Sequence, residues 1–204
     1  MNEEPVRLTC GALTLEGRAA LPPGAARAAI VCHPHPQYGG DMNNSVVVAV
    51  ARALHDRGVA TLRFDFRGVG NSDGTYSGNL AETDDARAAV AWFHERLPQA
   101  RICLGGYSFG AIVALLAGHG AEAVDRLFAI ALPVTMFEAA PIVGSSKAKL
   151  FLAGDHDAYC PSPALEALVQ RFSGENQLVR LAGADHFLFG REAEVGDAVA
   201  RFVL

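Results

Sequence analysis

The feature that most constrains the fold of this chain is a serine flanked by glycines at the end of a short apolar run. The motif reads Gly106-Tyr107-Ser108-Phe109-Gly110, and small and apolar residues follow it. A G-x-S-x-G motif between a strand and a helix is typical of a sharp turn that lifts the serine hydroxyl clear of a sheet. Because such a turn is very tight, we expect that Gly106 and Gly110 have no room for a Cβ. The first free N–H group of the helix, that of Phe109, would face the space in front of Ser108.

Glycine-rich loops also bind phosphates and dinucleotides, and the spacing of the glycines tests both possibilities. A phosphate-binding P-loop requires Lys and Ser or Thr after the last glycine, where this chain has Ala111-Ile112. A dinucleotide-binding fingerprint requires G-x-G-x-x-G after the first strand of a βαβ unit, and the glycines at 68, 70 and 74 have the wrong spacing. A serine that merely packs inside a tight turn is the remaining alternative, which the other strand ends must decide.

Length and charge limit the class of protein. The 204 residues are 50% hydrophobic and 19% charged, which predicts a single globular domain over residues 1–204 with a sheet covered on both faces. A net charge of -5 without a basic cluster predicts no nucleic-acid partner and no membrane partner. The acidic N-terminus and the lack of a long apolar run predict neither a signal peptide nor a transmembrane helix.

The four cysteines are widely spaced and form no C-x-x-C pair. Cys32 and Cys103 lie inside apolar runs, where a reduced cysteine acts as a small hydrophobic residue. A reduced, cytoplasmic protein is therefore expected.

Strand-like and helix-like segments alternate after an opening hairpin. Strands are predicted over residues 6–10, 13–20, 28–32, 60–66, 101–104, 127–132, 149–153 and 178–181, and helices over residues 45–57, 80–97, 111–119, 163–172 and 192–204. This order predicts an α/β fold: a mainly parallel, doubly wound sheet of about eight strands with an N-terminal antiparallel hairpin and helices on both faces. Residues 133–149 have room for a turn or one short helix, so no cap domain is expected.

Ligands of such folds bind at the carboxyl ends of the strands. The chemically useful residues at the predicted strand ends are His33, His35, Asp65, Arg67, Ser108, Pro133, residues 155–157, Asp185 and His186. They include a nucleophile, an acid and a base in the chain order Ser, Asp, His. That order argues against a serine that merely packs.

A serine needs a base to act as a nucleophile, usually an imidazole held by a carboxylate. His186 is the best candidate because it follows the last strand on a loop. The histidines at 55, 94 and 119 lie within helices or at their ends. His156 lies between two aspartates and could act as the base only with a different loop geometry.

Two aspartates compete to be the carboxylate. Asp157 lies farther from the strand end than Asp155 and has more freedom to reach His186. Asp155 is better placed to bond local backbone amides, as short acidic side chains do in turns. Asp157 is therefore favoured, and Asp185 is expected to shape its own loop.

With these motifs in view, the chain resembles the α/β-hydrolase superfamily over nearly its whole length. It is most similar to the small, capless esterase-like and dienelactone-hydrolase-like members. The matching stretches are residues 67–72, 106–110, 154–157 and 185–186. The resemblance implies that Ser108 is the nucleophile, Asp157 the orienting acid and His186 the base, with no cofactor.

The first loop departs from the family pattern. The family usually has His-Gly-x, in which the amide of x forms half of the oxyanion hole, whereas this chain has His33-Pro34-His35-Pro36. Proline has no N–H to donate, so His35 is the nearby residue in register with x. We expect the N–H groups of His35 and Phe109 to bind the oxyanion.

A metal site is the competing use of His33 and His35, together with Asp155 and His186. Side chains of His-x-His in an extended segment point to opposite sides, and no third ligand has motif spacing, so no metal is expected. Asp65 and Arg67 are expected to form a structural ion pair or to support their loop.

The expected reaction is hydrolysis of small carboxylic esters through an acyl-enzyme. An open site without a lid would be lined by some of Tyr38, Met42, Met136, Phe137, Tyr159 and Phe187. Lactone, dienelactone or thioester hydrolysis would use the same residues, and a non-catalytic binding module could share the fold. A peptidase or carbon–carbon hydrolase would need further pocket elements. The sequence does not decide the oligomeric state, and a homodimer is compatible with it.

Overall fold

The computed structural model describes all residues from 1 to 204. The chain forms eight strands: β1 (Glu4–Cys10), β2 (Leu13–Ala20), β3 (Arg27–Cys32), β4 (Ala60–Phe64), β5 (Arg101–Tyr107), β6 (Val124–Ile130), β7 (Ala148–Gly154) and β8 (Asn176–Leu181). It also forms five α-helices: α1 (Ser45–His55), α2 (Glu82–Arg96), α3 (Phe109–Gly118), α4 (Ser162–Val169) and α5 (Glu192–Val203). Two short 3-10 helices are η1 (Pro36–Tyr38) and η2 (Ala140–Ile142).

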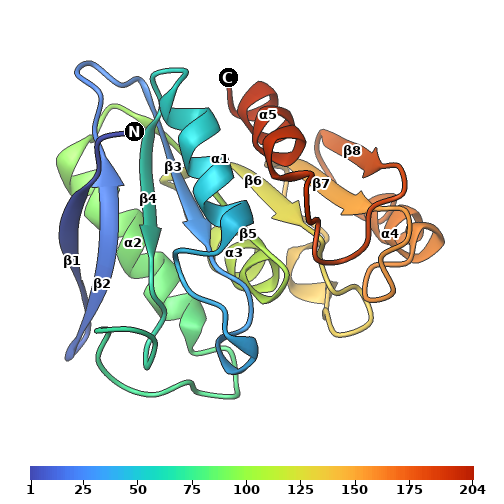
Figure 1. Cartoon of the computed structure of the whole chain (residues 1–204), viewed down its shortest axis with the longest axis horizontal. Coiled ribbons are helices and arrows are strands. Elements are labelled where there is room, and N and C mark those ends of the chain that lie inside the picture. Colours follow the sequence, from blue (N-terminus) through green and yellow to red (C-terminus); the bar gives the residue numbers. More distant parts are fainter.

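All eight strands join one sheet in the order β1-β2-β4-β3-β5-β6-β7-β8 (Figure 1). β1 and β2 form an antiparallel hairpin, and β2 also pairs antiparallel with β4. The strands from β3 to β8 are parallel to one another. The predicted fold class is therefore confirmed, including the N-terminal hairpin.

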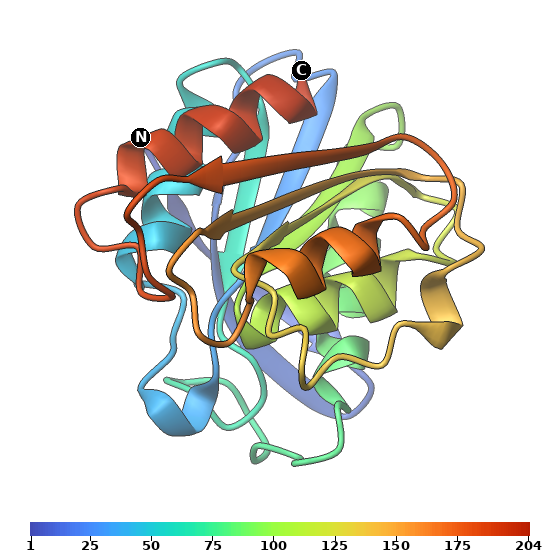
Figure 2. The same cartoon turned by 90° about the vertical axis from the view of Figure 1, so that its right-hand side faces the viewer.

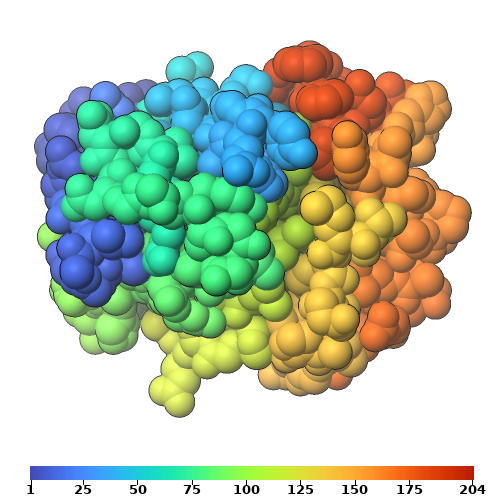
Figure 3. All heavy atoms as spheres, turned by 90° about the horizontal axis from the view of Figure 1, so that it is seen from below, coloured from blue at the N-terminus to red at the C-terminus, as the bar shows by residue number.

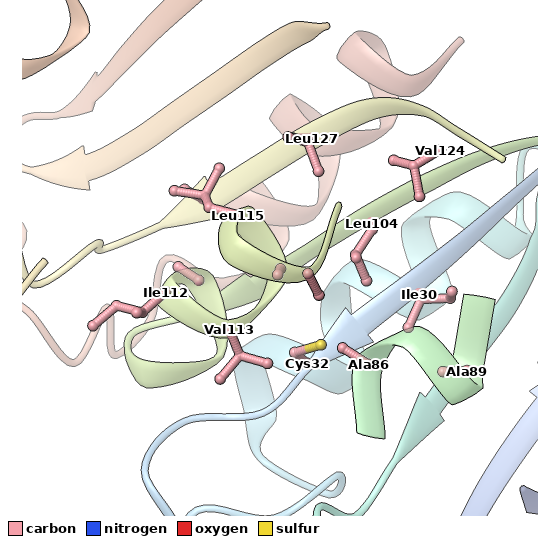
Figure 4. Close-up of a cluster of buried hydrophobic side chains, with 14 of the residues drawn as sticks. Ile30, Cys32, Ala86, Ala89, Leu104, Ile112, Val113, Leu115, Val124 and Leu127 are labelled. Atoms are coloured by element: carbon pink, nitrogen blue, oxygen red, sulfur yellow. The ribbon is translucent and has the colours of Figure 1, made fainter. Parts of the chain in front are cut away.

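Helices cover both faces of the sheet (Figure 2). The larger core lies under α2, α3 and α4, and the smaller core lies under α1 and α5. Figure 4 shows part of the larger core, where Ile30 of β3 lies beside Ala89 of α2 and Cys32 of β3 lies beside Val113 of α3. Strand β3 is buried on both faces, which explains its continuous apolar sequence. Strand β4 is buried too, and its charged residue Arg63 pairs with Glu3.

The ends of several elements differ from the predicted bounds by two or three residues. β4 ends at Phe64, two residues early, because the N–H of Asp65 donates to the carbonyl of Glu16 and the chain then turns away. β6 begins at Val124, three residues early, since Val124 and Arg126 still pair with β5, with a shift in register between them. α1 begins at the predicted residue 45, where the Asn44 side chain accepts the N–H of Val46 and caps the helix.

The segment between β6 and β7 contains only the short helix η2, so no cap covers the strand ends. None of the five α-helices combines the length and apolar character that crossing a bilayer requires. All four cysteines are free thiols, and those at 32, 103 and 160 are buried.

Candidate active site

Ser108 lies in a strained turn between β5 and α3. Its backbone has φ 55° and ψ -117°, a conformation that L-residues rarely adopt. A Cβ at Gly106 would overlap the carbonyl of Gly110, and a Cβ at Gly110 would overlap the carbonyl of Cys32. The expectation that both positions exclude a Cβ is thus confirmed. The N–H of Ser108 donates to the carbonyl of Ile130 at 2.8 Å, which ties the turn to β6.

Three side chains from three different strand ends meet at this turn. Ser108 Oγ lies 2.9 Å from His186 Nε2, and His186 Nδ1 lies 2.8 Å from Asp157 Oδ2. A carboxylate can only accept, so Nδ1 carries the proton and the Nε2 lone pair accepts the Ser108 hydroxyl. Asp157 is 3% exposed, which shields its contact with the imidazole from water.

The geometry of the loop after β7 shows which of the two candidate aspartates contacts His186. Asp157 uses its second oxygen, Oδ1, to accept the N–H groups of Tyr159 at 2.8 Å and Cys160 at 3.0 Å. Asp155 instead accepts the N–H of Gly183 at 2.7 Å, so it holds two loops together. His156 is exposed and lies 3.9 Å from Asp155. The carboxylate in contact with His186 is that of Asp157.

Tyr107 is a residue whose contact the sequence reasoning missed, although it lies inside the serine motif. Its hydroxyl donates to the backbone carbonyl of His186 at 2.9 Å. Burial raises the pKa of Tyr107 well above its usual value of 10.0, so the hydroxyl remains a donor. The contact fixes the backbone that carries the His186 imidazole.

The loop after β3 is held in place by the His33 ring. His33 is fully buried; its Nδ1 donates to the carbonyl of Pro34 at 2.6 Å, and its Nε2 accepts the N–H of Phe66 at 3.1 Å. Burial lowers the pKa of His33 to about 4, so the ring is neutral. The Pro34 carbonyl and the His35 N–H belong to one peptide unit, which His33 therefore orients.

The two expected amide donors have no partner in the backbone around them. The N–H of His35 donates to no other atom of the chain. Phe109 is the first residue of α3, where N–H groups lack a partner within the helix. Both amides are therefore available to a ligand, and both residues line the cavity at Ser108.

The His35 imidazole supports its own loop. Its Nδ1 accepts the N–H of Gln37 at 3.2 Å, and its Nε2 lies 3.1 Å from the Tyr76 hydroxyl. The ring also packs against Tyr38 and Phe109, with centroid distances of 4.9 Å to each. Neither His33 nor His35 points its ring nitrogens at Asp155 or His186, and no three metal-ligating side chains come together in the chain.

The expected ion pair between Asp65 and Arg67 is wrong. Arg67 pairs instead with the fully buried Asp85 of α2 at 2.6 Å. Asp65 accepts the N–H of Met42 at 2.7 Å, and burial raises the pKa of its carboxyl to about 6. Both side chains support their loops, which was the alternative to an ion pair, but their partners lie far away in the sequence.

A cavity of about 340 Å³ opens beside Ser108. Of the six side chains expected to line it, four do: Tyr38, Met136, Tyr159 and Phe187. Met42 and Phe137 do not, because Met42 is buried near Asp65 and Phe137 belongs to the larger core. Figure 3 views this face: the blue segment around residues 35–40 and the yellow segment after β6 face each other across a hollow.

The geometry can be set beside known proteins. Residues 29–191 match the family model Hydrolase_4, described as serine aminopeptidase, S33. The chain is 33% identical to the uncharacterized protein RP471 of Rickettsia prowazekii, over 93% of this chain and 84% of that one.

Two solved structures are similar over almost their full length. An alpha-beta serine hydrolase homologue from Coxiella burnetii is 34% identical, with a TM-score of 0.91 over 100% of this chain and 99% of that one. XC6422 from Xanthomonas campestris, described as an α/β serine hydrolase without lid, is 31% identical, with a TM-score of 0.88 over 98% of this chain and 93% of that one. With its capless sheet and this match over most of its length, the chain belongs to the serine aminopeptidase S33 (Hydrolase_4) family of α/β hydrolases.

Proposed function

We propose that this chain hydrolyses small carboxylic esters through a covalent acyl-enzyme formed on Ser108. The observation that carries the proposal is the continuous pair of hydrogen bonds from Ser108 through His186 to Asp157, at 2.9 and 2.8 Å. A hydroxyl, an imidazole and a carboxylate in this order are the working parts of nucleophilic acyl transfer.

In the proposed acylation step, His186 Nε2 takes the Ser108 proton while Oγ attacks the ester carbonyl carbon. The N–H groups of His35 and Phe109 bind the resulting oxyanion. Nε2 then gives the proton to the leaving oxygen, the carbon–oxygen bond breaks, and the alcohol departs. Asp157 keeps the proton of the imidazole on Nδ1 and stabilises the imidazolium.

Deacylation repeats these movements with water. His186 Nε2 takes a proton from water, the hydroxide attacks the acyl carbon, and the same two amides bind the second oxyanion. The bond to Ser108 Oγ then breaks and Oγ recovers its proton from His186. One ester and one water yield one acid and one alcohol.

The cavity lining favours esters over peptides with a free N-terminus. The fifteen lining residues include no aspartate or glutamate, so a substrate's α-ammonium group would meet no carboxylate there. Seven of them are hydrophobic, and we assign substrate contacts to Tyr38, Met136, Tyr159 and Phe187. Lactones and thioesters fit the same chemistry and belong in the substrate panel.

The test compares Ser108→Ala with Ser162→Ala in p-nitrophenyl acetate hydrolysis. Ser162 begins α4, outside the cavity, and serves as the matched control. We expect Ser108→Ala to lose about 10⁴-fold or more in kcat and to resist fluorophosphonate labelling. Turnover and labelling that survive in Ser108→Ala would assign the chemistry to another residue.

We further propose a reducing, cytoplasmic location for the chain. Its four cysteines are unpaired, and burial raises the pKa of Cys160 to about 12, which keeps that thiol protonated and unreactive. Fractionation of cells that express the tagged chain tests this, and recovery from a secreted or periplasmic fraction would contradict it.

A further inference from the structure

Two exposed aromatic side chains contact the His186 ring, and a third stacks on one of them. The ring of Tyr159 lies 4.7 Å from the His186 ring, and the ring of Phe187 lies 5.9 Å from it on a T-shaped approach. Phe189 stacks on Phe187 at 5.9 Å with an interplanar angle of 15°. The three are 51%, 53% and 76% exposed, in chain order. Tyr159, Phe187 and Phe189 are called the aromatic wall below.

The position of His186 decides which half of an ester meets this wall. In the proposed reaction, the imidazole gives its proton to the oxygen of the departing alcohol, so that oxygen must lie against Nε2. The carbonyl oxygen points the other way, toward the N–H groups of His35 and Phe109. Since Tyr159 and Phe187 of the aromatic wall lie against the His186 ring, the group attached to the departing oxygen leaves the cavity along this wall.

The part of the cavity that α3 forms is already packed. Phe109 is 7% exposed and contacts the rings of His35 and Tyr76, while Ile112 is 5% exposed. These side chains belong to α3 and have little surface left to cover. Four large side chains of the lining keep open surface: Tyr159 and Phe187, about half exposed, and Tyr38 and Met136, which are more exposed still. Of these four, Tyr159 and Phe187 lie against the His186 ring, whereas the Tyr38 ring contacts His35.

We propose that the alcohol half of the substrate carries a flat aromatic ring that lies against the aromatic wall. Aromatic rings attract one another at centroid distances of about 4.5–7 Å. The rings of Phe187 and Phe189 in the wall already lie 5.9 Å apart. This inference rests on the proposed ester hydrolysis and adds to it the class of leaving group.

Two isomeric esters test the proposal. Benzyl acetate carries its ring on the alcohol, and methyl phenylacetate carries the same ring on the acyl group. Their alcohols have similar acidity, so the departure of the alcohol is matched. We expect the wild-type chain to prefer benzyl acetate by about 10-fold in kcat/KM. Acid release followed in a pH-stat gives the rates, and p-nitrophenyl acetate monitors the basal activity.

Variants of Phe187 test whether the preference for benzyl acetate comes from the aromatic wall. We expect Phe187→Ala to bring the ratio of the two esters within about threefold, and Phe187→Tyr to keep it, because tyrosine preserves the ring. Leu21→Ala is the matched control, since Leu21 is 46% exposed in the loop at the other end of the sheet. We expect it to leave the ratio unchanged.

Several results would overturn the proposal. A wild-type preference for methyl phenylacetate, or none at all, would remove the aromatic ring from the alcohol half. An equal loss on both esters in Phe187→Ala would make the wall a general support of the site. If wild type turned over neither these esters nor p-nitrophenyl acetate, the proposed function itself would fail, a result distinct from the loss of the ester preference alone.

Discussion

At the scale of single residues, each member of the Ser108–His186–Asp157 arrangement is held by a further contact on its far side. Backbone amides bind the second oxygen of Asp157, the Tyr107 hydroxyl binds the backbone carbonyl of His186, and the Ser108 N–H binds β6. A site held in this way needs little rearrangement when charge develops. The arrangement is therefore built before any substrate arrives.

The first prediction concerns the second oxyanion donor. His35 has φ -60°, which proline adopts without strain, so His35→Pro removes the N–H with little change of the backbone. His35→Ala is the matched control, because it also loses the imidazole but keeps the N–H. We expect kcat of the proline variant to fall about 10²–10³-fold below that of the alanine variant. Equal activity in the two folded variants would exclude His35 as a donor.

The second prediction concerns the buried imidazole of His33. Its pKa falls from an ordinary 6.5 to about 4 on folding, so below pH 6.5 the unfolded chain binds a proton that the folded chain does not. Stability from this residue is present above pH 6.5 and is lost as the pH falls toward 4, by about 3 kcal/mol at most. Urea unfolding across this window, compared with His33→Gln, measures it. The same slope in both proteins would rule out a neutral buried His33.

Asp65 changes the stability of the folded chain with pH in the opposite direction to His33, over part of the same pH range. Burial raises its pKa from an ordinary 3.8 to about 6, so the folded chain binds the extra proton between these values. Its contribution to stability is present below pH 3.8 and is lost as the pH rises toward 6. The wild-type curve contains both effects, which is why the difference from His33→Gln is the useful quantity.

The sequence predicted the positions of single residues correctly where those residues belong to a recognisable motif. Ser108, Asp157 and His186 each stand at a strand end and were found to lie together, although their catalytic roles stay a proposal. The contacts of Tyr107 and Arg67 could not be predicted. Arg67 pairs with Asp85 and not with the nearer Asp65 because α2 brings a buried carboxylate to it, which no local pattern reveals.

At the scale of elements, the turn between β5 and α3 makes the most specific demand. The third prediction is that Gly106→Ala destabilises the chain by about 3 kcal/mol or more and abolishes activity, since its Cβ would overlap the carbonyl of Gly110. Gly120→Ala, where a Cβ has open space, should change stability by no more than about 0.5 kcal/mol. Chemical denaturation of both variants makes the comparison. A harmless Gly106→Ala would mean that the turn can relax.

The type and order of the elements could be predicted, but their ends could not. Apolar runs and alternation identified every strand, because buried strands are rich in apolar residues and half-buried strands alternate apolar with polar residues. β8 begins at Asn176, two residues before the predicted start, since its polar residues pair with β7 at the edge of the sheet. Backbone pairing of this kind depends on neighbouring strands and not on the local sequence.

At the scale of the whole molecule, one sheet joins two cores on its opposite faces. The fourth prediction is that residues 1–204 unfold as the single domain proposed from the sequence. Far-ultraviolet circular dichroism and the fluorescence of Trp92, the one tryptophan, should then show the same midpoint in urea. Trp92 belongs to the larger core, so separate midpoints would mean that the two faces unfold independently and would contradict one domain.

The central claim, an acyl-enzyme on Ser108, is tested most directly by trapping it. Wild-type protein is mixed with p-nitrophenyl acetate, quenched in acid and digested with trypsin, which releases residues 102–126 as one peptide. Mass spectrometry should find one acetyl group on that peptide, with fragmentation assigning it to Ser108, and none in Ser108→Ala. An acetyl group on another side chain, or turnover without any acetylated peptide, would contradict the account.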